Sequence, residues 1–389
     1  MVFSDRLKNL PPQFFASLAL KVAYAVNEGR DVINLGQGNP DQPTPLHIVK
    51  ALQKAVENPE THKYSPFRGT DELRQAASDF YKQQYDVTID PKTEVAILFG
   101  AKAGLVELPL ALMNEDELML LPDPGYPDYL SGAGLANVNY ETMPLSAENN
   151  YLPDYGNLTE EHKRLAKLIY LNYPNNPTGA TASLEFFEET IELAKESDIK
   201  VVHDFAYGAI GFDGKKPVSY MQAKGAKENG IELYTMSKTY NMAGWRVGFA
   251  VGNKHMIEAI NLIQDHLYVG LFPAVQHAAA VALTADQSCV DDLVKLYEQR
   301  REVLIAECKR IGWDVTAPGG SFFSWLPVPE GYTSEGFTEF LLEKADVAVA
   351  AGNGFGKHGE GYVRVGLLVD EKRIKEAISR IEKLSIFTR

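Results

Sequence analysis

Leu233-Tyr-Thr-Met-Ser-Lys238-Thr-Tyr-Asn-Met-Ala-Gly-Trp-Arg246-Val-Gly is the stretch of sequence on which the fold assignment depends. Its apolar residues predict a short strand that ends just before Lys238. At a strand end, partial desolvation and a nearby cation lower the pKa of an amine enough for it to act as a covalent catalyst. Arg246, on the same segment, could hold an anion beside that amine. Taken alone, a lysine after a strand is most often a solvated surface residue, so the assignment depends on the whole segment 233–248.

The whole phrase resembles the cofactor-lysine motif of the class I and II aminotransferases, the fold type I enzymes that use pyridoxal phosphate. The resemblance implies that Lys238 carries the cofactor covalently and then acts as the general base. It also implies that Thr235, Ser237 and Arg246 contribute to the binding site of the cofactor phosphate. Four further partners should then occur in a fixed order along the chain.

A glycine turn follows the apolar run 95–99 and precedes a helix-like stretch. Gly100 allows a tight turn, after which the backbone N–H groups of Ala101 and Lys102 can cap a phosphate at a helix N-terminus. A lone glycine turn is a weak signal, but this one stands where the family has its phosphate loop. Lys102 adds a cation there, where many relatives have an acidic or alanine-containing triplet.

The segment Tyr170-Leu-Asn-Tyr-Pro-Asn-Asn176-Pro-Thr-Gly179 combines two prolines and a glycine, which predict an extended turn after a strand. It is either an ordinary βα loop or the equivalent of the family's Asn-Pro-Thr-Gly motif. The second interpretation implies that Asn176 hydrogen-bonds the phenolic oxygen of the cofactor and lies beside the substrate.

A carboxylate ends the apolar strand expected at residues 199–203. Such a group is costly to bury unless it meets a cation. Without a cofactor, Asp204 would be a helix N-cap in the following loop. With the cofactor, it would pair with the pyridinium N–H and keep the ring protonated, and the protonated ring is the electron sink of this chemistry. Tyr207 resembles the family's second donor to the phenolic oxygen.

The fourth partner is Arg364, in the late strand-like segment 362–366, where alternation places it opposite the neighbouring valines. A bidentate guanidinium suits an α-carboxylate, although on its own this residue would be assigned to a strand-edge salt bridge. The segment Asn34-Leu-Gly-Gln-Gly38-Asn-Pro could be only a turn-rich crossover. Its resemblance to the family's Gly-x-Gly-x-Pro segment implies that Gly38 lets the backbone approach the substrate carboxylate.

Two aromatic residues complete the resemblance. Tyr126, in Pro122-Asp-Pro-Gly-Tyr126-Pro, matches the family position whose ring stacks on the pyridine ring, although a proline-rich turn is the simpler interpretation. Tyr64, in His62-Lys-Tyr64-Ser-Pro, is similar to the family's tyrosine that reaches the phosphate of the neighbouring subunit. The resemblance therefore implies a homodimer with shared active sites.

Short apolar strands alternate with helical stretches, which predicts an α/β fold with a mostly parallel sheet covered by helices. The site motifs fall at the C-terminal ends of these strands, where open α/β sheets place their sites. The resemblance implies the fold type I arrangement, with a seven-stranded sheet and a smaller α+β domain. We expect strands at 95–99, 117–121, 167–171, 199–203, 233–236, 247–251, 313–316, 321–326, 347–350 and 362–368, and helices at 183–197, 256–266, 290–311, 334–345 and 371–384. We predict an N-terminal arm with part of the smaller domain in 1–33, the larger domain in 34–285 and the smaller domain in 286–389.

Composition limits the partners and the compartment. The 389 residues are 45% hydrophobic, which fits a two-domain globular chain. A net charge of −14 disfavours nonspecific binding to nucleic acid and to anionic membranes. Cys289 and Cys308 have no paired spacing, so neither a disulfide framework nor a metal site is expected. Lys8 and Lys21 interrupt the apolar N-terminus, which argues against a signal peptide and predicts a cytoplasmic location.

The function implied is a ping-pong transfer of an amino group between an amino acid and a 2-oxo acid. Apolar residues of the expected side-chain pocket favour an uncharged substrate. The chain also resembles the bacterial methionine-salvage branch of the family, which implies methionine formation from 4-methylthio-2-oxobutanoate. Two alternatives remain: a carbon–sulfur β-lyase on the same scaffold, and the sensor domain of a regulator. The pocket residues expected are Phe14, Phe15, Tyr64, Tyr126, Tyr268, Leu271 and Phe272.

Overall fold

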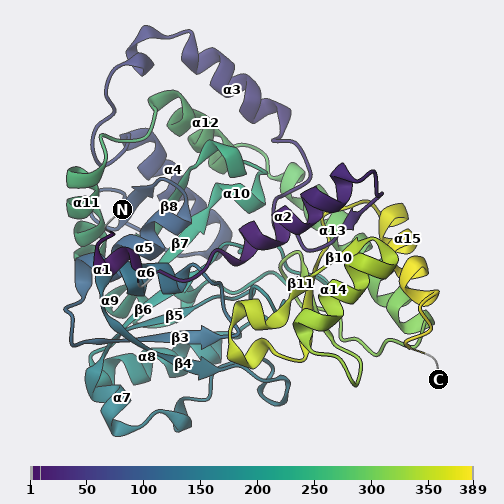
Figure 1. The fold of residues 1–389 in the computed structure, drawn as a ribbon. Helices are drawn as coiled ribbons and strands as arrows, with labels where there is room; N and C mark the ends of the chain where they lie inside the picture. Colours follow the sequence, from purple (N-terminus) through teal and green to yellow (C-terminus); the bar gives the residue numbers. More distant parts are fainter. Residues whose placement is uncertain (1–2, 9, 388–389) are drawn as a thin grey trace.

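Seven strands form the central sheet of the larger part of the molecule, in the order β2-β8-β7-β6-β5-β3-β4 (Figure 1). The structure is a computed structural model that describes residues 3–8 and 10–387. β8 runs antiparallel to β2 and β7, and the other neighbouring pairs are parallel. This arrangement confirms the predicted α/β fold with a mostly parallel seven-stranded sheet. The strands are β2 (Val95–Leu98), β3 (Leu118–Asp123), β4 (Asn139–Pro144), β5 (Ala166–Leu171), β6 (Lys200–Asp204), β7 (Gly230–Thr235) and β8 (Gly248–Gly252).

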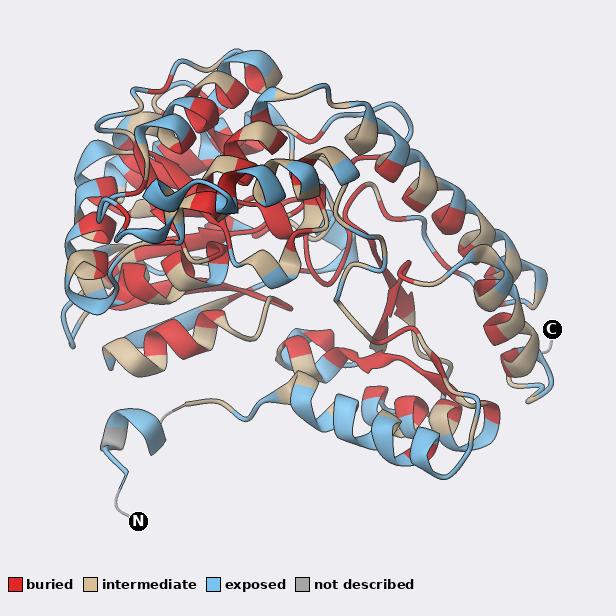
Figure 2. Ribbon diagram, turned by 90° about the horizontal axis from the view of Figure 1, so that it is seen from above, coloured by how far each residue is buried: buried red, intermediate tan, exposed pale blue. Residues whose placement is uncertain are grey.

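Helices cover both faces of this sheet, because alternate strand residues point to opposite sides and both sides are apolar. Val202 and Leu233 belong to the cluster under α5, α6 and α11, whereas Val201 and Phe249 belong to the cluster that includes α4, α8 and α12. Figure 2 shows the strands buried and the outer helix faces exposed. The helices of the larger part are α3 (Leu46–Val56), α4 (Asp71–Tyr85), α5 (Ala101–Leu112), α6 (Tyr129–Ala136), α7 (Glu160–Leu165), α8 (Leu184–Ser197), α9 (Ala226–Asn229), α10 (Met236–Thr239), α11 (Lys254–Leu267) and α12 (Pro273–Thr284).

Polar side chains fix where several helices begin. Thr70 and Ser183 cap α4 and α8 by accepting a hydrogen bond from a backbone N–H of the first turn, and Asn253 caps α11 in the same way. Asp198, with φ of 51°, ends α8 in the left-handed conformation. These local signals explain why the helices expected at 183–197 and 256–266 are found within two residues of their predicted ends.

The smaller part of the molecule has its own apolar cluster, which includes Trp313, Phe337 and Ile378. A three-stranded antiparallel sheet has the order β11-β12-β9, and a parallel pair joins β1 near the N-terminus to β10. This pairing connects the N-terminal segment to the C-terminal part, while the exact domain boundaries stay a prediction. The elements are α1 (Asp5–Lys8), α2 (Phe14–Asn27), β1 (Ile33–Asn34), α13 (Ser288–Arg310), β9 (Phe323–Pro327), α14 (Ser334–Ala345), β10 (Val347–Ala348), β11 (Ala350–Ala351), β12 (Tyr362–Gly366) and α15 (Glu371–Glu382).

Two strand predictions in this part were wrong. The segment 313–316 is irregular chain in which buried Trp313 and Val315 alternate with exposed Asp314, a pattern that imitates a half-buried strand. Trp313 is held by packing on Phe387 and by donating its indole N–H to the carbonyl of Pro327 at 2.8 Å. The single strand expected at 347–350 is divided into β10 and β11, which belong to different sheets. The strands β1 and β4 were not anticipated.

The helix α2 lies across the junction between the two parts (Figure 1). Its residues Phe14, Phe15 and Leu18 pack against a small cluster formed by Trp325, Ala350 and Phe355. Within residues 3–8 and 10–387, every helix is too short or too polar to cross a membrane.

Candidate active site

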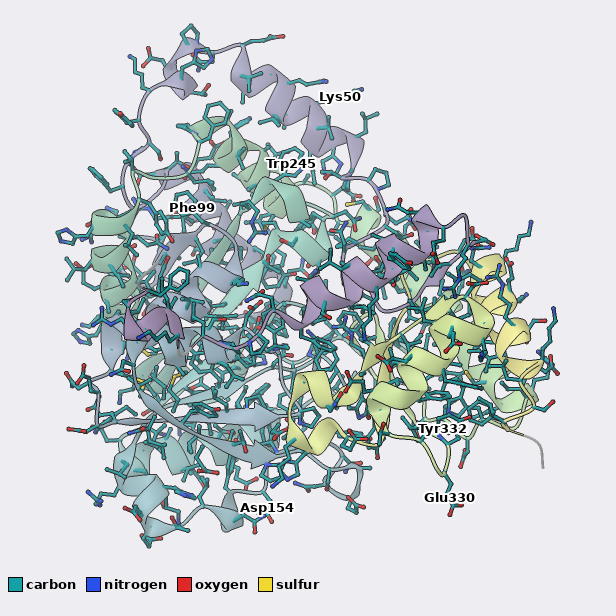
Figure 3. The ribbon with its side chains drawn as sticks, viewed as in Figure 1. Lys50, Phe99, Asp154, Trp245, Glu330 and Tyr332 are labelled. Atoms are coloured by element: carbon teal, nitrogen blue, oxygen red, sulfur yellow. The ribbon has the colours of Figure 1, made fainter. Side chains whose placement is uncertain are left out.

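A cavity of about 460 Å³ lies where the C-terminal ends of the parallel strands face β12. Figure 3 shows the side chains of the two flanking parts, with Phe99 and Trp245 labelled in the larger and Tyr332 in the smaller. Most of the predicted site residues meet in this cavity, although they come from segments far apart in the sequence. Those that line it are Gly38, Ala101, Lys102, Tyr126, Asn176, Asp204, Tyr207, Thr235, Ser237, Lys238, Arg246 and Arg364.

The reversed direction of β8 explains why Arg246 lies near Lys238. Lys238 is in α10, directly after the C-terminal end of β7, and Arg246 comes just before the first residue of β8. Because β8 is antiparallel to β7, its beginning lies at the same edge of the sheet as the end of β7. The Arg246 guanidinium is held by the carbonyl oxygens of Ala243 at 2.9 Å and Phe99 at 3.4 Å.

The amine of Lys238 donates a hydrogen bond to the carbonyl oxygen of Gly38 at 2.9 Å. Part of the side chain remains accessible from the cavity, but burial of the amine lowers the pKa of Lys238 to about 8. The cations Arg364 and Arg246 lower this pKa further, and Asp204 opposes them. A substantial fraction of the amine is therefore neutral near pH 8, as a nucleophile or a base requires.

Asp204 is the last residue of β6 and points to the face covered by α5, α6 and α11, where the Tyr129 hydroxyl donates to its Oδ2 at 2.9 Å. It does not cap a helix. Its other oxygen, Oδ1, is buried without a hydrogen-bond partner among the described residues. Burial raises the pKa of Asp204 to about 6, against the opposing hydrogen bond from Tyr129. A cationic N–H placed at Oδ1 would satisfy this oxygen and favour the charged carboxylate.

The phosphate-binding groups predicted from the sequence converge on one end of the cavity. Gly100, with φ of 82°, precedes the first residue of α5, so the free N–H groups of that helix point outward. A side chain at Gly100 would collide with the guanidinium of Arg246. Thr235 and Ser237 add hydroxyl groups, with the Thr235 hydroxyl donating to Ser237 Oγ at 3.0 Å. A helix N-terminus, a guanidinium and two hydroxyls form a site for an anion.

Lys102 lines the same end, but its ammonium group forms an ion pair with Asp128 at 2.8 Å. The added cation noted in the sequence therefore has a carboxylate partner within the chain. Tyr126 lies nearby, with its ring in edge contact with Tyr129 at 5.6 Å.

Arg364 is 1% exposed and forms no ion pair with the described residues of the chain. Its Nη1 donates to Asn176 Oδ1 at 2.9 Å and its Nη2 to the carbonyl oxygen of Gly36 at 3.0 Å, whereas Nε has no partner among those residues. Burial lowers the pKa of Arg364 to about 9. A Cβ added to Gly38 would lie 3.7 Å from Nη2, so the glycine leaves room beside the guanidinium. A buried cation of this kind is suited to an anionic ligand.

Two residues that the sequence analysis did not single out hold the site together. Asn172 accepts a hydrogen bond from the backbone N–H of Asn176 at 2.7 Å and donates to the carbonyl oxygen of Asp204 at 2.7 Å. Tyr129 holds Asp204 as described above. Both lie within or next to quoted motifs, so their positions were visible, but their partners depend on the packing of neighbouring strands. Tyr207 is buried, and its ring packs against the rings of Phe322 and Phe323.

Of the apolar residues expected near the substrate, several lie away from the cavity in the single chain. Tyr64 is 88% exposed and Phe272 is 42% exposed, and neither lines the cavity. Tyr268 packs on Phe99 at a centroid distance of 4.5 Å, and Leu271 belongs to the core of the larger part. Phe15 lines the cavity, and Phe14 packs behind it at 5.2 Å.

Neither a metal site nor a disulfide is found within residues 3–8 and 10–387. This part of the chain contains no group of three histidine, cysteine, aspartate or glutamate side chains able to hold a metal ion. Cys289 and Cys308 are free thiols.

Comparison with known proteins agrees with this geometry. The sequence profile of aminotransferase class I and II matches residues 30–381. The chain belongs to the class I and II aminotransferases. A protein of Bacillus subtilis strain 168 named L-glutamine–4-(methylsulfanyl)-2-oxobutanoate aminotransferase is 64% identical over 385 residues, which cover 99% of this chain and 97% of that protein. Transaminase BacF of the same strain is 46% identical over 98% of this aminotransferase and 96% of BacF.

Solved structures give the same assignment. The substrate-bound structure of BacF superimposes with a TM-score of 0.95 at 46% identity, covering 99% of this aminotransferase and 98% of BacF. A mutant of Thermus thermophilus aspartate aminotransferase superimposes with a TM-score of 0.92 at 26% identity, covering 99% and 100% of the two chains. The prediction of a fold type I aminotransferase is confirmed.

Proposed function

We propose that this aminotransferase uses pyridoxal phosphate and transfers an amino group to 4-methylthio-2-oxobutanoate, which forms methionine. The observation that supports the cofactor most directly is that Oδ1 of Asp204, in the same cavity as the amine of Lys238, has no hydrogen-bond partner in the described part of the chain. The anion site at Gly100, Ser237 and Arg246 fits a phosphate, and Oδ1 of Asp204 fits a pyridinium N–H. The cavity thus offers complementary groups for both ends of the cofactor.

Each remaining residue has a role that follows from its contacts. When bound, the cofactor supplies a reactive carbonyl and a protonated ring that withdraws electrons from the substrate. Tyr126 lines the cavity, and we assign to it the role of covering the ring face. Asn176 has its amide oxygen engaged by Arg364, so its Nδ2 hydrogens can donate to the phenolic oxygen together with the Tyr207 hydroxyl. Arg364 receives the substrate α-carboxylate, with Gly38 leaving the space for it.

Lys238 is the group that moves protons. With its pKa lowered to about 8, it can tether the cofactor as a neutral amine and, once released, take the proton from the substrate Cα. The positive charges of Arg364 and Arg246 lie close enough to keep the amine from holding its proton too tightly.

The substrate assignment is supported by the relative that is 64% identical and whose name specifies 4-(methylsulfanyl)-2-oxobutanoate. The cavity agrees, since Phe15, Leu18 and Phe323 supply apolar lining near Arg364. That relative's name also gives glutamine as the first amino donor to test. The alternative of a carbon–sulfur β-lyase is not favoured, because the two similar proteins of Bacillus subtilis are named as an aminotransferase and a transaminase.

Exposed apolar side chains support a homodimer with shared active sites. Tyr64 and Phe67 on one segment, and Leu267, Val269 and Phe272 on another, are between 42% and 88% exposed. Isolated apolar residues are common on surfaces, but these two segments adjoin where Gly270 lies against Ser65 and Pro66, and adjoining exposed apolar side chains are typical of an interface. A second copy covering it would bring its Tyr64 toward a neighbouring phosphate site.

We also propose a cytoplasmic location, in keeping with the substrates.

Two experiments test the proposal. Purified protein should absorb in the visible range, and borohydride should fix the cofactor to Lys238 in a peptide identified by mass spectrometry. A protein that stays colourless and spectrally unchanged after addition of pyridoxal phosphate would contradict the cofactor assignment. A panel of 2-oxo acids in coupled half-reactions tests the substrate, and a clear preference for oxaloacetate over every apolar 2-oxo acid would refute it.

A further inference from the structure

A buried carboxylate joins the cofactor side of the cavity to the loop before β12. Asp123, the last residue of β3, is 4% exposed, and both of its oxygens bind the loop formed by residues 352–359. Oδ1 accepts the backbone N–H of His358 at 3.0 Å, and Oδ2 contacts His358 Nδ1 at 3.0 Å. An ionised carboxylate can accept hydrogen bonds but cannot donate one, so Nδ1 of His358 is the donor.

A second contact joins the same two loops. The backbone N–H of Gly125 donates to the carbonyl oxygen of Phe355 at 2.8 Å. Gly356 adopts a φ of 134°, and a side chain there would collide with the carboxylate of Asp123. Loop 352–359 is therefore built around Asp123, and its short helical turns lie beside the end of β3 (Figure 1). Tyr126, proposed to cover the cofactor ring, directly follows Gly125.

Phe355 is the residue in this loop that connects it to the substrate pocket. Its ring lies 4.7 Å from the guanidinium carbon of Arg364 and 5.8 Å from the ring of Phe15. Phe15 itself lines the cavity, and its ring is 5.0 Å from the same carbon of Arg364. Phe355 thus supports the apolar wall beside the carboxylate-binding arginine without lining the cavity itself.

We propose that Asp123 is a positioning residue for substrate specificity: by binding loop 352–359, it holds Phe355 behind Phe15 and thereby fixes the apolar wall that accepts a long uncharged side chain. This inference rests on the proposed function for its choice of substrates. A long side chain can contact more of this wall than a short one, so loss of Asp123 should affect long apolar substrates selectively. A purely structural role would lower activity toward short and long substrates alike.

The test compares two variants of Asp123. Asp123→Ala removes both contacts with His358. Asp123→Asn keeps an oxygen that accepts the His358 backbone N–H, and its amide NH2 can donate to Nδ1 of the other imidazole tautomer. Phe355→Ala removes the support directly. The matched control is Glu72→Ala, because Glu72 forms the same type of pair with His277 at 2.9 Å and neither residue lines the cavity. The cofactor-loaded protein is assayed with 4-methylthio-2-oxobutanoate and pyruvate. Calorimetry then measures binding of hexanoate and propanoate.

In Asp123→Ala, we expect the ratio of kcat/KM for 4-methylthio-2-oxobutanoate to that for pyruvate to fall about tenfold, as expected when a hydrophobic pocket loses contact with a side chain. The preference for hexanoate over propanoate should fall in parallel. Phe355→Ala should reproduce both changes. Asp123→Asn should keep most of the wild-type kcat/KM ratio, and Glu72→Ala should change neither the ratio nor the preference for hexanoate. If Asp123→Ala does not fold, Phe355→Ala and His358→Ala decide the question.

Equal losses for both 2-oxo acids, or an unchanged ratio in Phe355→Ala, would overturn the inference. The carboxylate measurements keep it separate from the proposed function. If no 2-oxo acid is aminated but the variants still lose the preference for hexanoate, the proposed substrate fails while the role of Asp123 stands.

Discussion

Replacing Asp204 by asparagine should stabilise the cofactor-free protein while impairing the enzyme. The pKa of Asp204 is raised from its ordinary value of 3.8 to about 6 by burial. A difference of about two pH units corresponds to about 3 kcal/mol of unfavourable free energy when the carboxylate is ionised. Asparagine has nearly the same shape and can still accept the Tyr129 hydroxyl, but it carries no charge.

The pH dependence gives this prediction its sign. Because the pKa is raised in the folded protein, folding favours the protonated carboxyl. Below about pH 4, Asp204 therefore does not lower the free energy of unfolding of the wild-type protein. The penalty grows as the pH rises, is about half present at pH 5 and is complete well above 6. For a chain of 389 residues the unfolding entropy is about 0.8 kcal/mol per kelvin. Asp204→Asn should therefore raise the Tm by about 4 °C at pH 8 and by about half as much at pH 5.

Calorimetric scans of the cofactor-free wild type and variant, at equal protein concentration and at both pH values, measure the effect. Asp314→Asn is the control, since Asp314 is exposed and lies on the surface of the smaller part. The same Asp204→Asn protein should have low turnover, because an unprotonated ring is a poor electron sink. A variant that is less stable than the wild type at pH 8, or that retains near-normal turnover, would refute the assignment of Asp204.

Four further outcomes are expected. Lys238→Ala should bind the cofactor noncovalently, as seen in its absorbance spectrum, but lose at least about 10²–10⁴-fold in turnover because tether and base are removed together; normal turnover would exclude it as the base. Arg364→Lys should lower kcat/KM for amino acids about 100-fold, since lysine cannot form the bidentate contact, while leaving cofactor affinity unchanged. Tyr129→Phe should raise the pKa of Asp204 further, by about one to two pH units, and move the acidic limb of the pH–rate profile upward. Mixing inactive Tyr64 and Lys238 variants should restore activity in exchanged dimers, and no recovery despite proven exchange would argue against shared sites.

The sequence allowed six of the seven strands of the larger sheet, all except β4, and most of the cavity to be predicted because their signals are local. Short apolar runs marked the strands, and the chemistry-bearing residues lie at their C-terminal ends: Asp204 is the last residue of β6, and Lys238 is in the helix that follows β7. The resemblance then assigned roles that no single motif could support. The family assignment was confirmed, whereas the individual roles remain to be tested by the substitutions above.

Features that depend on distant partners could not be predicted. The segment 313–316 has strand-like alternation, but it is not paired as a strand: the backbone N–H of Trp313 bonds Cys308 near the end of α13, and only the indole side chain of Trp313 reaches Pro327 of β9. β10 and β11 form one apolar run in the sequence, and only their pairing with β1 and β12 separates them. Asn172 and Asp123 were visible in quoted motifs, yet their contacts with Asp204 and with loop 352–359 arise from tertiary packing.

Three of the shifted pKa values in the cavity, those of Asp204, Lys238 and Arg364, have one common cause and one common consequence. Burial moves the pKa of Asp204 up to about 6 and those of Lys238 and Arg364 down to about 8 and 9. Each shift records a charge that the chain alone does not fully compensate. A cofactor with a cationic ring and a substrate with a carboxylate would place the missing opposite charges beside Asp204 and Arg364. Ligand binding should then remove part of the cost of folding, so the Tm should rise on cofactor addition, and the pH dependence assigned to Asp204 should largely disappear.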